Sequence, residues 1–551
     1  MVLLLSLLFL GNFSAAQDST AACPRPIAGS QVVSPPELSS KHRILELNLY
    51  FRGDALHRGD LPLRYCYVTD SGLQSPTLRV KPGDQLVIHF HNQLNHIRIA
   101  NEAGSPTAAD SKRQKTDCSD VAMSPTGTNL HFHGLNIAPV CHQDDVIHTT
   151  IQPGESFDYD IVIPRDTTPG LYWYHPHLHG FTERQVQGGA SGALIVDGVE
   201  DGQNATANLL QRVLILRDQP LSDVTPSEQE RPSWDISLNF VPVLYKKYLP
   251  AEIRVPSNQK ELWRVLNAAA GTIFNLQVLS EGRPQTVEVL AIDGVPLENA
   301  NTHRFTTDLV LPPASRAEFV LTTPLIGTQA QLVTRSWNTG LVGDIDPGRP
   351  IANLVGDTSA TGTTSPRDRA DVSVVAHGKV PDLRNVKVTA TRKLYFSELP
   401  EDPNDPDAVT YFFLTLAGQK PALYDMTASP NIEVRQGDVE DWLIENRALE
   451  DHVFHAHQLH FQILEINGKA LLDREIRDTV NVDHWNGSGP YPSVRVRMDF
   501  RGSNLAGGLF PYHCHILRHE DMGMMGTIKV LPSNSAPRSK TGNPTSMPRH
   551  Q

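Results

Sequence analysis

Short runs of alternating apolar and polar residues recur along the whole chain, separated by Gly, Pro and Asp. The stretch 78–92, LRVKPGDQLVIHFHN, is typical: apolar side chains recur at alternate positions on both sides of a Pro-Gly-Asp turn. Alternation with a period of two indicates strands that bury one face. Many such strands at close spacing predict an all-β fold made of β-sandwiches.

The alternating pattern contains an internal repeat. Residues 76–92, 250–267 and 430–446 each predict a strand, a turn and a second strand. In every copy a valine precedes an asparagine by twelve positions: Val80 and Asn92, Val255 and Asn267, Val434 and Asn446. Three copies of one unit predict three similar domains.

A second repeat links only the first and third copies. Residues 170–177 read GLYWYHPH and residues 508–515 read GLFPYHCH, and a glycine-led apolar strand follows each. The middle copy lacks this sequence, so we interpret it as a spacer. The expected ranges are a first domain at 40–198, a spacer domain at 205–370, a third domain at 385–532 and a disordered polar tail at 533–551.

Composition and charge narrow the class of protein. The chain has 39% hydrophobic and 20% charged residues and a formal net charge of −13, which disfavours nucleic acid or an anionic membrane as a partner. The N-terminal apolar run, Val2 to Leu10, is followed by small residues and predicts a signal peptide at 1–16, cleaved before Gln17. The run is too short to span a bilayer. We therefore expect a secreted or periplasmic protein without a membrane anchor.

Four His-x-His units are the main candidates for metal chemistry. A strand directs residues i and i+2 to the same face, so each unit aims two imidazoles at one point. The units are His131 and His133, His175 and His177, His455 and His457, and His513 and His515. Eight imidazoles exceed the ligands of one ion and suit a cluster of two or three ions at a domain interface. His89 and His91 also fit the pattern but have no counterpart in the other repeats, so we interpret them as strand surface; His179 and His460 are interpreted as outer or structural residues.

The segment 513–525, HCHILRHEDMGMM, identifies the metal. Cys514 and His519, with His452 upstream, supply one thiolate and two imidazoles, and Met524 supplies a weak thioether. Two histidines, one cysteine and a distant axial methionine form a blue-copper electron-transfer site. Met522 and Met525 are the alternative axial ligands, although packing under the loop is the better interpretation for both. Strand alternation points Cys514 to one side and its two neighbouring histidines to the other.

The five cysteines leave an even number if Cys514 is a metal ligand. In an exported chain the other four allow two disulfides with three possible connectivities. Proximity in sequence favours Cys118–Cys141 and Cys23–Cys66.

These motifs resemble those of the multicopper oxidase family over nearly the whole mature chain. The resemblance implies three cupredoxin-like Greek-key β-sandwich domains and four copper ions: one type 1, one type 2 and two type 3. By the family pattern, the type 1 site is His452, Cys514 and His519 with axial Met524; the type 2 ligands are His131 and His455; one type 3 ion takes His133, His175 and His515, and the other takes His177, His457 and His513. No ligand position is missing.

The resemblance also implies an activity: one-electron oxidation of a small reducing substrate coupled to four-electron reduction of O₂ to water. Four protons are needed, so carboxylates should lie near the cluster. Glu520 and Asp144 are the candidates, and Asp145 is the rival of Asp144. Glu450 and Asp451 adjoin His452 and are candidates to accept a phenol proton or attract a cationic amine; plain surface charge is the alternative for both.

The substrate class is open at the sequence level. A laccase-like oxidase of phenols or aromatic amines is the leading hypothesis. A metal-ion (cuprous or manganese) oxidase or a bilirubin-type oxidase is the alternative, although the chain has only eight methionines and lacks the thioethers that Cu(I) capture near His452 would need. A non-catalytic copper-binding or storage protein is the hypothesis from another class, and the complete ligand set argues against it.

Overall fold

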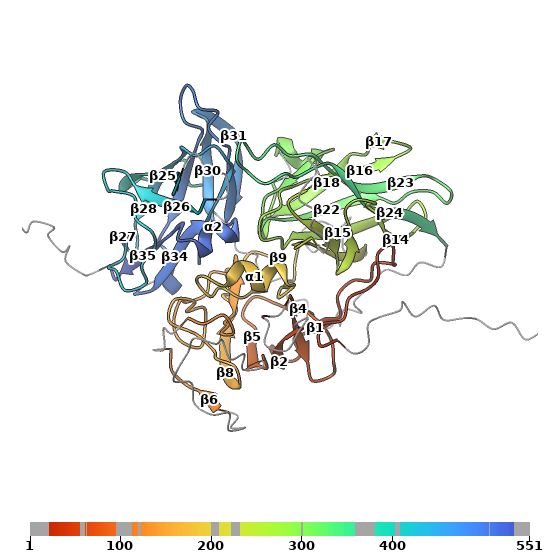
Figure 1. Ribbon diagram of the computed structural model, residues 1–551, viewed down its shortest axis with the longest axis horizontal. Helices are drawn as coiled ribbons and strands as arrows, with labels where there is room; N and C mark the ends of the chain where they lie inside the picture. The colour runs from red at the N-terminus through yellow and green to blue at the C-terminus, as the bar shows by residue number, and fades with distance from the viewer. Residues whose placement is uncertain are drawn as a thin grey trace, which may run out of the picture.

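The fold is almost entirely β in the computed structural model, which describes residues 21–54, 61, 63–94, 113–118, 123–199, 209–221, 232–298, 301–358, 381–402, 408–505 and 507–533. Six sheets pack in three pairs, coloured red to orange, green and blue in Figure 1. The all-β prediction is confirmed. The predicted signal peptide and positions 534–551 of the predicted tail lie outside the described residues. The limits of the three domains stay predictions.

The first pair contains both strands of the first predicted repeat. One sheet has the order β1 (Glu37–Ser39), β4 (Thr77–Val80), β10 (Gly192–Val196), β9 (Gly170–His175) and β7 (His131–His133). The other has the order β3 (Arg64–Thr69), β2 (Ile44–Asp54), β5 (Gln85–Asn92), β8 (Glu155–Val162) and β6 (Arg113–Lys115). Apolar side chains of both sheets form one core, which includes Phe51, Phe90 and Phe132.

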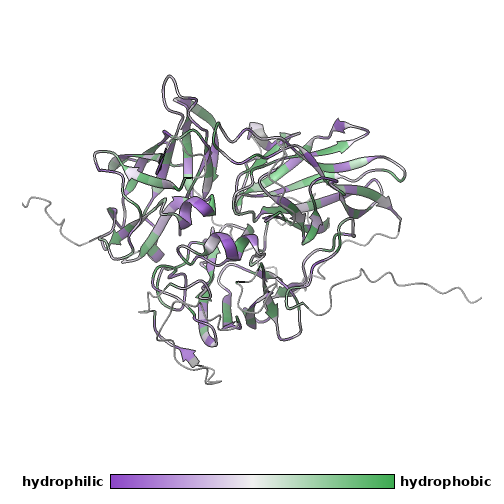
Figure 2. Cartoon of the chain, in the orientation of Figure 1, coloured by the Kyte–Doolittle hydropathy of each residue, from purple (hydrophilic) through white to green (hydrophobic). Residues whose placement is uncertain are grey.

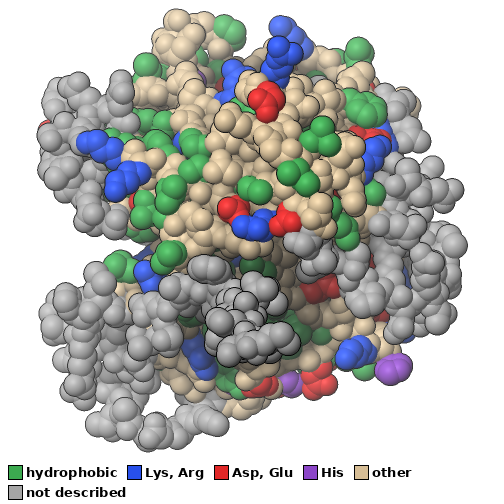
Figure 3. All heavy atoms as spheres, turned by 90° about the vertical axis from the view of Figure 1, so that its right-hand side faces the viewer, with side chains coloured by type: hydrophobic (Ala, Val, Ile, Leu, Met, Phe, Trp, Pro, Cys, Tyr) green, Lys and Arg blue, Asp and Glu red, His purple; other side chains and the backbone are tan. Residues whose placement is uncertain are grey.

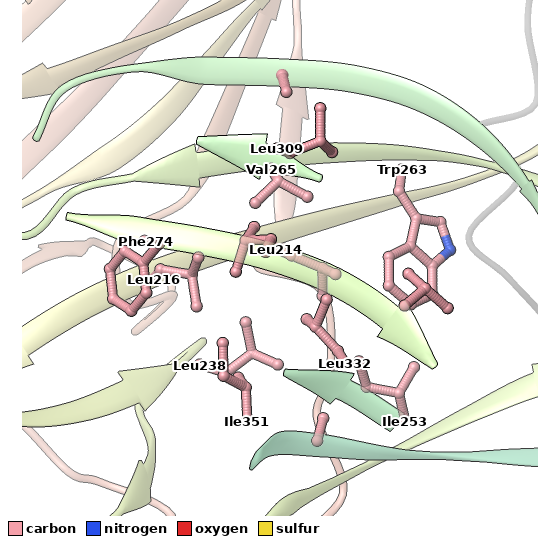
Figure 4. Close-up of a cluster of buried hydrophobic side chains, with 14 of the residues drawn as sticks. Leu214, Leu216, Leu238, Ile253, Trp263, Val265, Phe274, Leu309, Leu332 and Ile351 are labelled. Atoms are coloured by element: carbon pink, nitrogen blue, oxygen red, sulfur yellow. The ribbon is translucent and has the colours of Figure 1, made fainter. Parts of the chain in front are cut away.

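The second pair follows the same plan with more strands. One sheet has the order β13 (Val241–Val243), β12 (Asp235–Leu238), β11 (Leu210–Gln219), β15 (Lys260–Asn267), β22 (Arg316–Thr322), β18 (Val287–Ile292) and β19 (Val295–Pro296), with β20 (Phe305–Thr306) beside β18. The other has β14 (Ala251–Pro256), β24 (Arg349–Asp357), β23 (Ala330–Arg335), β16 (Phe274–Ser280) and β17 (Arg283–Pro284), with β21 (Leu309–Leu311) beside β16. A 3₁₀ turn covers Thr302–Arg304. Figure 4 shows Trp263, Phe274 and Ile351 within the core between the two sheets.

The third pair contains the strands around residues 452–515. One sheet has the order β26 (Thr410–Leu416), β25 (Ala390–Pro400), β28 (Val439–Asn446), β33 (Ser493–Asp499), β30 (Phe461–Ile466) and β31 (Lys469–Arg477). The other has β27 (Ile432–Arg435), β35 (Met525–Leu531), β34 (Leu509–Cys514), β29 (His452–Ala456) and β32 (Thr479–Val482). A 3₁₀ turn covers Ser503–Leu505.

The repeated asparagine has one structural role in all three pairs. At the end of its strand, the side-chain oxygen accepts a hydrogen bond from the backbone N–H two residues later, at 3.0 Å for Asn92 and 2.9 Å for Asn267 and Asn446. The side-chain amide donates to two backbone carbonyl oxygens of neighbouring loops and strand ends. Because a buried turn needs partners for its backbone groups, this side chain ends each strand in the same way.

Two short helices mark the place where the three pairs of sheets meet. Helices α1 (Thr182–Gln187) and α2 (Leu517–Asp521) lie side by side at the centre of Figure 1. Val186 of α1, Ala270 of the second pair and Leu517 of α2 form a small buried apolar cluster. The Leu517 N–H donates to the Ala270 carbonyl at 2.8 Å. The three pairs therefore share one junction.

The surface carries charges of both signs. Hydrophobic and hydrophilic residues alternate along strands of all three pairs in Figure 2, and Figure 3 shows acidic and basic side chains interspersed on the described part of one face. Among the described residues, no helix is long and apolar enough to cross a membrane. The disulfides Cys23–Cys66 and Cys118–Cys141 are both formed, and Cys514 is free and buried.

A buried ion pair joins the second pair of sheets to the other two. Both terminal nitrogens of Arg316, on β22, donate to the carboxylate of Asp478, beside β32, at 2.8 and 2.7 Å. The Arg316 Nε donates to the Leu171 carbonyl of β9 at 3.0 Å. Both side chains are fully buried. Burial alone would raise the pKa of Asp478, but the charge and hydrogen bonds of Arg316 hold that pKa well below its usual value.

Replacement of Arg316 by methionine should destabilise the protein, because it leaves the Asp478 carboxylate buried without its cation. Removal of one partner from such a pair costs about 3–5 kcal/mol of unfolding free energy. Chemical denaturation monitored by tryptophan fluorescence measures the change. The matched control is Arg335→Met, which breaks an exposed pair with Asp308 in the same pair of sheets and should cost about 1 kcal/mol or less. Equal losses in the two variants would contradict the assigned role of Arg316.

Candidate metal centre

Strand pairing brings the four His-x-His units together in two groups. In the first pair of sheets, β7 and β9 run antiparallel with His131 opposite His175. In the third pair, β29 and β34 run antiparallel with His455 opposite His513. The histidine-bearing ends of both strand pairs lie at the interface between these two pairs of sheets, so all eight imidazoles gather there. Each is buried, with at most 2% of its surface exposed.

The ring nitrogens converge closely enough to share ions. The Nε2 atoms of His177, His457 and His513 lie 3.1–3.2 Å from one another, across the interface. Three nitrogens at mutual hydrogen-bond distance cannot all be satisfied by one another. The donor atoms of His131 lie within 4.8 Å of those of His455 and His457, and also of those of His133 and His175. The assignment of each histidine to one particular ion stays a prediction.

Several buried nitrogens of the cluster lack a hydrogen-bond partner, which shows whether the cluster is suited to metal ions. Within the eight-histidine cluster, the buried ring nitrogens without a hydrogen-bond partner among the described residues are His131 Nε2, His133 Nδ1, His175 Nε2, His455 Nε2, His457 Nδ1 and both nitrogens of His515. Leaving a buried polar atom unpartnered costs about 1–3 kcal/mol, so seven of them in one place need an explanation. Bound cations provide it, and the residues fit a metal cluster.

In three of the histidines, the ring nitrogen that faces away from the cluster has the hydrogen-bond partner expected of a metal-bound imidazole. His175 Nδ1 donates to the Pro176 carbonyl at 2.9 Å, His455 Nδ1 to the Asp478 carbonyl at 2.7 Å and His513 Nδ1 to the Cys514 carbonyl at 2.9 Å. Such bonds fix the tautomer and leave the opposite nitrogen as the ligand atom. Burial lowers the pKa of these imidazoles, to about 3 for His513, so each ring is neutral and able to bind a cation.

Cys514 lies with two histidines on the other side of β34. Its Sγ is 3.6 Å from His452 Nδ1 and 3.7 Å from His519 Nδ1, and the two nitrogens are 3.1 Å apart. The Val453 N–H donates to Sγ at 3.4 Å. Burial raises the pKa of the thiol, so a thiolate here needs a bound cation. The predicted trio is therefore assembled around one point.

The three methionines of 513–525 take different positions. The Met524 N–H donates to the His519 carbonyl at 2.9 Å, and its carbonyl accepts from the Cys514 N–H at 3.1 Å, so its fully buried side chain starts beside the trio. Met522 is half-buried and packs against the core of the third pair. Met525 is opposite His513 on β35 and lines a cavity at the histidine cluster.

The two predicted carboxylates both adjoin the cluster. Asp144 accepts from His131 Nδ1 at 2.9 Å, from the Phe132 N–H at 3.0 Å and from the Gln458 side-chain amide. Its rival Asp145 instead accepts from the His148 ring at 2.9 Å. The fully buried Glu520 has one oxygen 3.2 Å from His513 Nδ1 and the other 3.6 Å from His177 Nε2. Burial raises the pKa of Glu520 well above its usual value.

Two carboxylates contact the outer nitrogens of the Cys514 trio. Glu398, on β25, lies 3.1 Å from His452 Nε2, and Glu450 lies 3.1 Å from His519 Nε2. Burial and the neighbouring Glu398 raise the pKa of Glu450 to about 8. Asp451 points elsewhere: it accepts from the Trp337 indole at 2.9 Å and from the His484 ring at 2.8 Å.

The other candidate histidines lie outside the convergent donors. On β5, His89 bonds to Asp158 and Glu46 at the sheet surface, and His91 bonds to Ser156 and Asn48. His460 donates to the Asp293 carbonyl at 2.9 Å and lies 3.6 Å from Asp478. His179 is half-buried and contacts the Tyr424 ring.

Sequence reasoning missed Asp478, Arg316 and Glu398. Asp478 lies 3.4 Å from His133 Nε2, and its carbonyl accepts from His455. None of the three belongs to a repeat or stands near a histidine motif, so only the tertiary fold brings them to the site.

Comparison with known protein families gives a consistent assignment. Two family models, both described as multicopper oxidase, match residues 121–201 and 400–534. The first range contains His131, His133, His175 and His177, and the second contains the Cys514 trio and the remaining histidines of the cluster.

Individual relatives agree with this assignment. The multicopper oxidase mco of Staphylococcus haemolyticus is 23% identical over 473 residues, 84% of this chain and 89% of that protein. A laccase of Bacillus subtilis is 21% identical and covers 90% of this chain and 96% of its own length. The solved multicopper oxidase of Campylobacter jejuni, titled a metallo-oxidase, has the same fold, with a TM-score of 0.64, 23% identity and coverage of 95% of this chain and 99% of that one. The family models, the curated relatives and the solved structure therefore all indicate a multicopper oxidase.

Proposed function

We propose that the protein is a laccase-like oxidase, which takes single electrons from a small phenolic or aromatic amine substrate and reduces O₂ to water. The observation that supports this proposal is the position of Cys514. Its side chain belongs to one complete donor set, while His513 and His515, its neighbours in sequence, belong to another. A storage protein has no need of two buried donor sets joined by one residue of backbone.

Four copper ions fit the donors in the arrangement that the resemblance implies. His452, Cys514 and His519, with Met524, would hold the type 1 ion, and the eight clustered histidines would hold one type 2 and two type 3 ions. When bound, copper supplies the one-electron redox chemistry that joins substrate oxidation to O₂ reduction. The chain supplies the connection: the Cys514 carbonyl accepts from His513 Nδ1 at 2.9 Å, which adds a hydrogen-bonded path to the covalent one.

Protons reach the cluster through buried carboxylates in this proposal. Glu520 touches His513 and His177, and Asp144 touches His131, so one carboxylate lies on each side of the interface. Both are excluded from water. Reduction of O₂ to water consumes four protons, and a positioned carboxyl group is the common means of delivering them.

The reducing substrate meets the chain at the outer nitrogens of the type 1 histidines. Glu398 and Glu450 contact these nitrogens, and the apolar side chains of Leu341 and Val342, 74% and 58% exposed, lie on the loop paired with Glu450. An exposed apolar surface beside two carboxylates suits an aromatic electron donor. The carboxylates can accept its proton or form an ion pair with its positive charge. The same two carboxylates could also bind a reducing metal cation, so a metal-ion oxidase is the second candidate function.

The oxidase proposal predicts a fixed stoichiometry. Copper-loaded protein should consume one O₂ for every four one-electron equivalents of a methoxyphenol or aromatic diamine, without accumulating hydrogen peroxide. Cys514→Ser should abolish both the blue absorption and this turnover, because the thiolate gives the colour and the electron path. An oxygen electrode with a peroxide assay measures the ratio. Blue colour retained in the copper-loaded variant would contradict the type 1 assignment, and copper-loaded wild type without O₂ uptake would favour storage.

Glu520→Gln should slow O₂ reduction about tenfold or more, within the range typical of a positioned proton donor. The side chains are nearly the same shape, so copper content should hold. Stopped-flow mixing of the reduced enzyme with O₂, monitored by return of the blue band, measures the step. Asp145→Asn is the matched control, because that carboxylate bonds to His148 instead of the cluster. Wild-type reoxidation in Glu520→Gln would remove Glu520 from the proton path.

At a pH above the raised pKa of Glu450, where both carboxyl groups are charged, the double variant Glu398→Gln/Glu450→Gln should lower kcat/KM for a cationic aromatic amine about tenfold, at the low end of electrostatic focusing. The loss for a neutral methoxyphenol should be smaller, and added salt should shrink the difference. Glu433→Gln, an exposed acidic position of β27, is the control. Retention of the amine preference in the double variant would place the reductant elsewhere, and selective loss of Mn(II) or Fe(II) oxidation would favour the metal-ion candidate.

A further inference from the structure

A small cavity lies beside the histidine cluster, with His177 in its lining. It has about 10 Å³ of space, room for roughly one water molecule. Its lining includes His177, His179, Tyr424 and three methionines, Met123, Met426 and Met525. Met525 and His177 are buried, whereas Met123, Met426 and His179 are half-buried. The cavity therefore runs from the surface inward to a residue of the cluster.

The lining is rich in soft donors. Three of the eight methionines in the chain line this one cavity, and they come from three separate segments. His179 adds a buried Nδ1 that has no hydrogen-bond partner among the described residues. Core packing does not explain the two half-buried methionines, Met123 and Met426, because neither belongs to the core of any pair of sheets. Thioethers with an imidazole are the ligands that select Cu(I).

We propose that this cavity binds Cu(I) and passes it to the buried histidines. The donors are the sulfurs of Met123, Met426 and Met525 with His179 Nδ1. His177 lines the cavity and also belongs to the convergent set with His457 and His513, and Met525 is opposite His513 in the strand register. An ion can therefore change ligands from thioether to imidazole without crossing the protein. The transfer is ligand exchange, and the oxidation state of copper does not change.

The position of this site separates it from the reductant. The candidate contact for reducing substrates, at Glu398 and Glu450, adjoins the outer nitrogens of His452 and His519, whereas the methionine cavity adjoins His177. Cu(I) bound in the cavity is therefore copper to be delivered to the cluster, and not the reducing substrate. The delivery step rests on the proposed copper function, but binding of Cu(I) by these donors does not.

Copper loading of the full chain tests the inference. Copper-free protein is mixed without oxygen with the Cu(I)–bicinchoninate complex, and loss of the complex's colour gives the rate of copper uptake. Met123→Leu/Met426→Leu should slow uptake about tenfold or more, the loss typical when residues supporting a metal site are removed. Loading with Cu(II) should proceed at the wild-type rate, because thioethers favour the cuprous ion. Leucine and methionine are similar in volume, and both positions are half-buried, so the fold should tolerate the change.

The control is Met498→Leu/Met522→Leu, two methionines of the third pair's core that do not line the cavity. Equal Cu(I) uptake in wild type and the cavity variant would overturn the inference, as would equal slowing in the control. Normal uptake with a raised KM for O₂ would assign the cavity to O₂ passage instead. Crystals soaked in Ag(I), a soft ion that is not oxidised, should show anomalous density between the three sulfurs; its absence would contradict binding. Failure of the oxidase proposal would show separately, as wild type that loads copper normally but consumes no O₂.

Discussion

The central constraint on this structure is the burial of eight imidazoles with several nitrogens left without partners. Each unpartnered nitrogen costs free energy, and the fold tolerates the set only where cations complete it. The surrounding structure keeps the donors apart and oriented: carbonyls of Pro176, Asp478 and Cys514 hold the outer nitrogens. Exclusion of water lowers the imidazole pKa, so protons do not compete with metal at neutral pH. Two pairs of sheets, each with one half of the donors, must therefore meet in a single arrangement.

The second pair of sheets contributes to that arrangement, although its sequence predicted only a spacer. Its Arg316 reaches Asp478 of the third pair and the Leu171 carbonyl of the first, and Asp478 touches His133. A guanidinium with its five donors is suited to joining a carboxylate and a carbonyl at once. Replacement of Gly134 by any larger residue would disturb this pair, because a Cβ added there would meet Arg316 and Asp478. The second pair of sheets supplies none of the eight clustered histidines, but its Arg316 thus helps to fix their positions.

The sequence predicted what depends on local pattern. Alternation predicted the all-β fold, and the Val-Asn repeat predicted three similar units, with each asparagine ending a strand. Spacing within His-x-His units selected the eight histidines that the structure brings together, and proximity favoured the two disulfides that form. Contacts between distant segments gave no local signal. Arg316 and Asp478 are 162 residues apart, Glu398 and His452 are 54 apart, and Gln458 reaches Asp144 across 314 positions. A single sequence shows such residues only as ordinary charged or polar positions of strands and loops.

Carboxylates beside imidazoles recur at both ends of the site, and exposure decides what each can do. Glu520 is enclosed against His513 and His177, where a charge has no solvent to stabilise it, so the group favours the protonated form and suits proton storage. Glu398 and Glu450 retain about a tenth of their side-chain surface, 11% each, so an external molecule can reach them. One strand, β34, separates the two environments by placing Cys514 and its flanking histidines on opposite faces. Strand alternation therefore keeps the two donor sets on opposite faces, although Cys514 and its neighbouring histidines are adjacent in sequence.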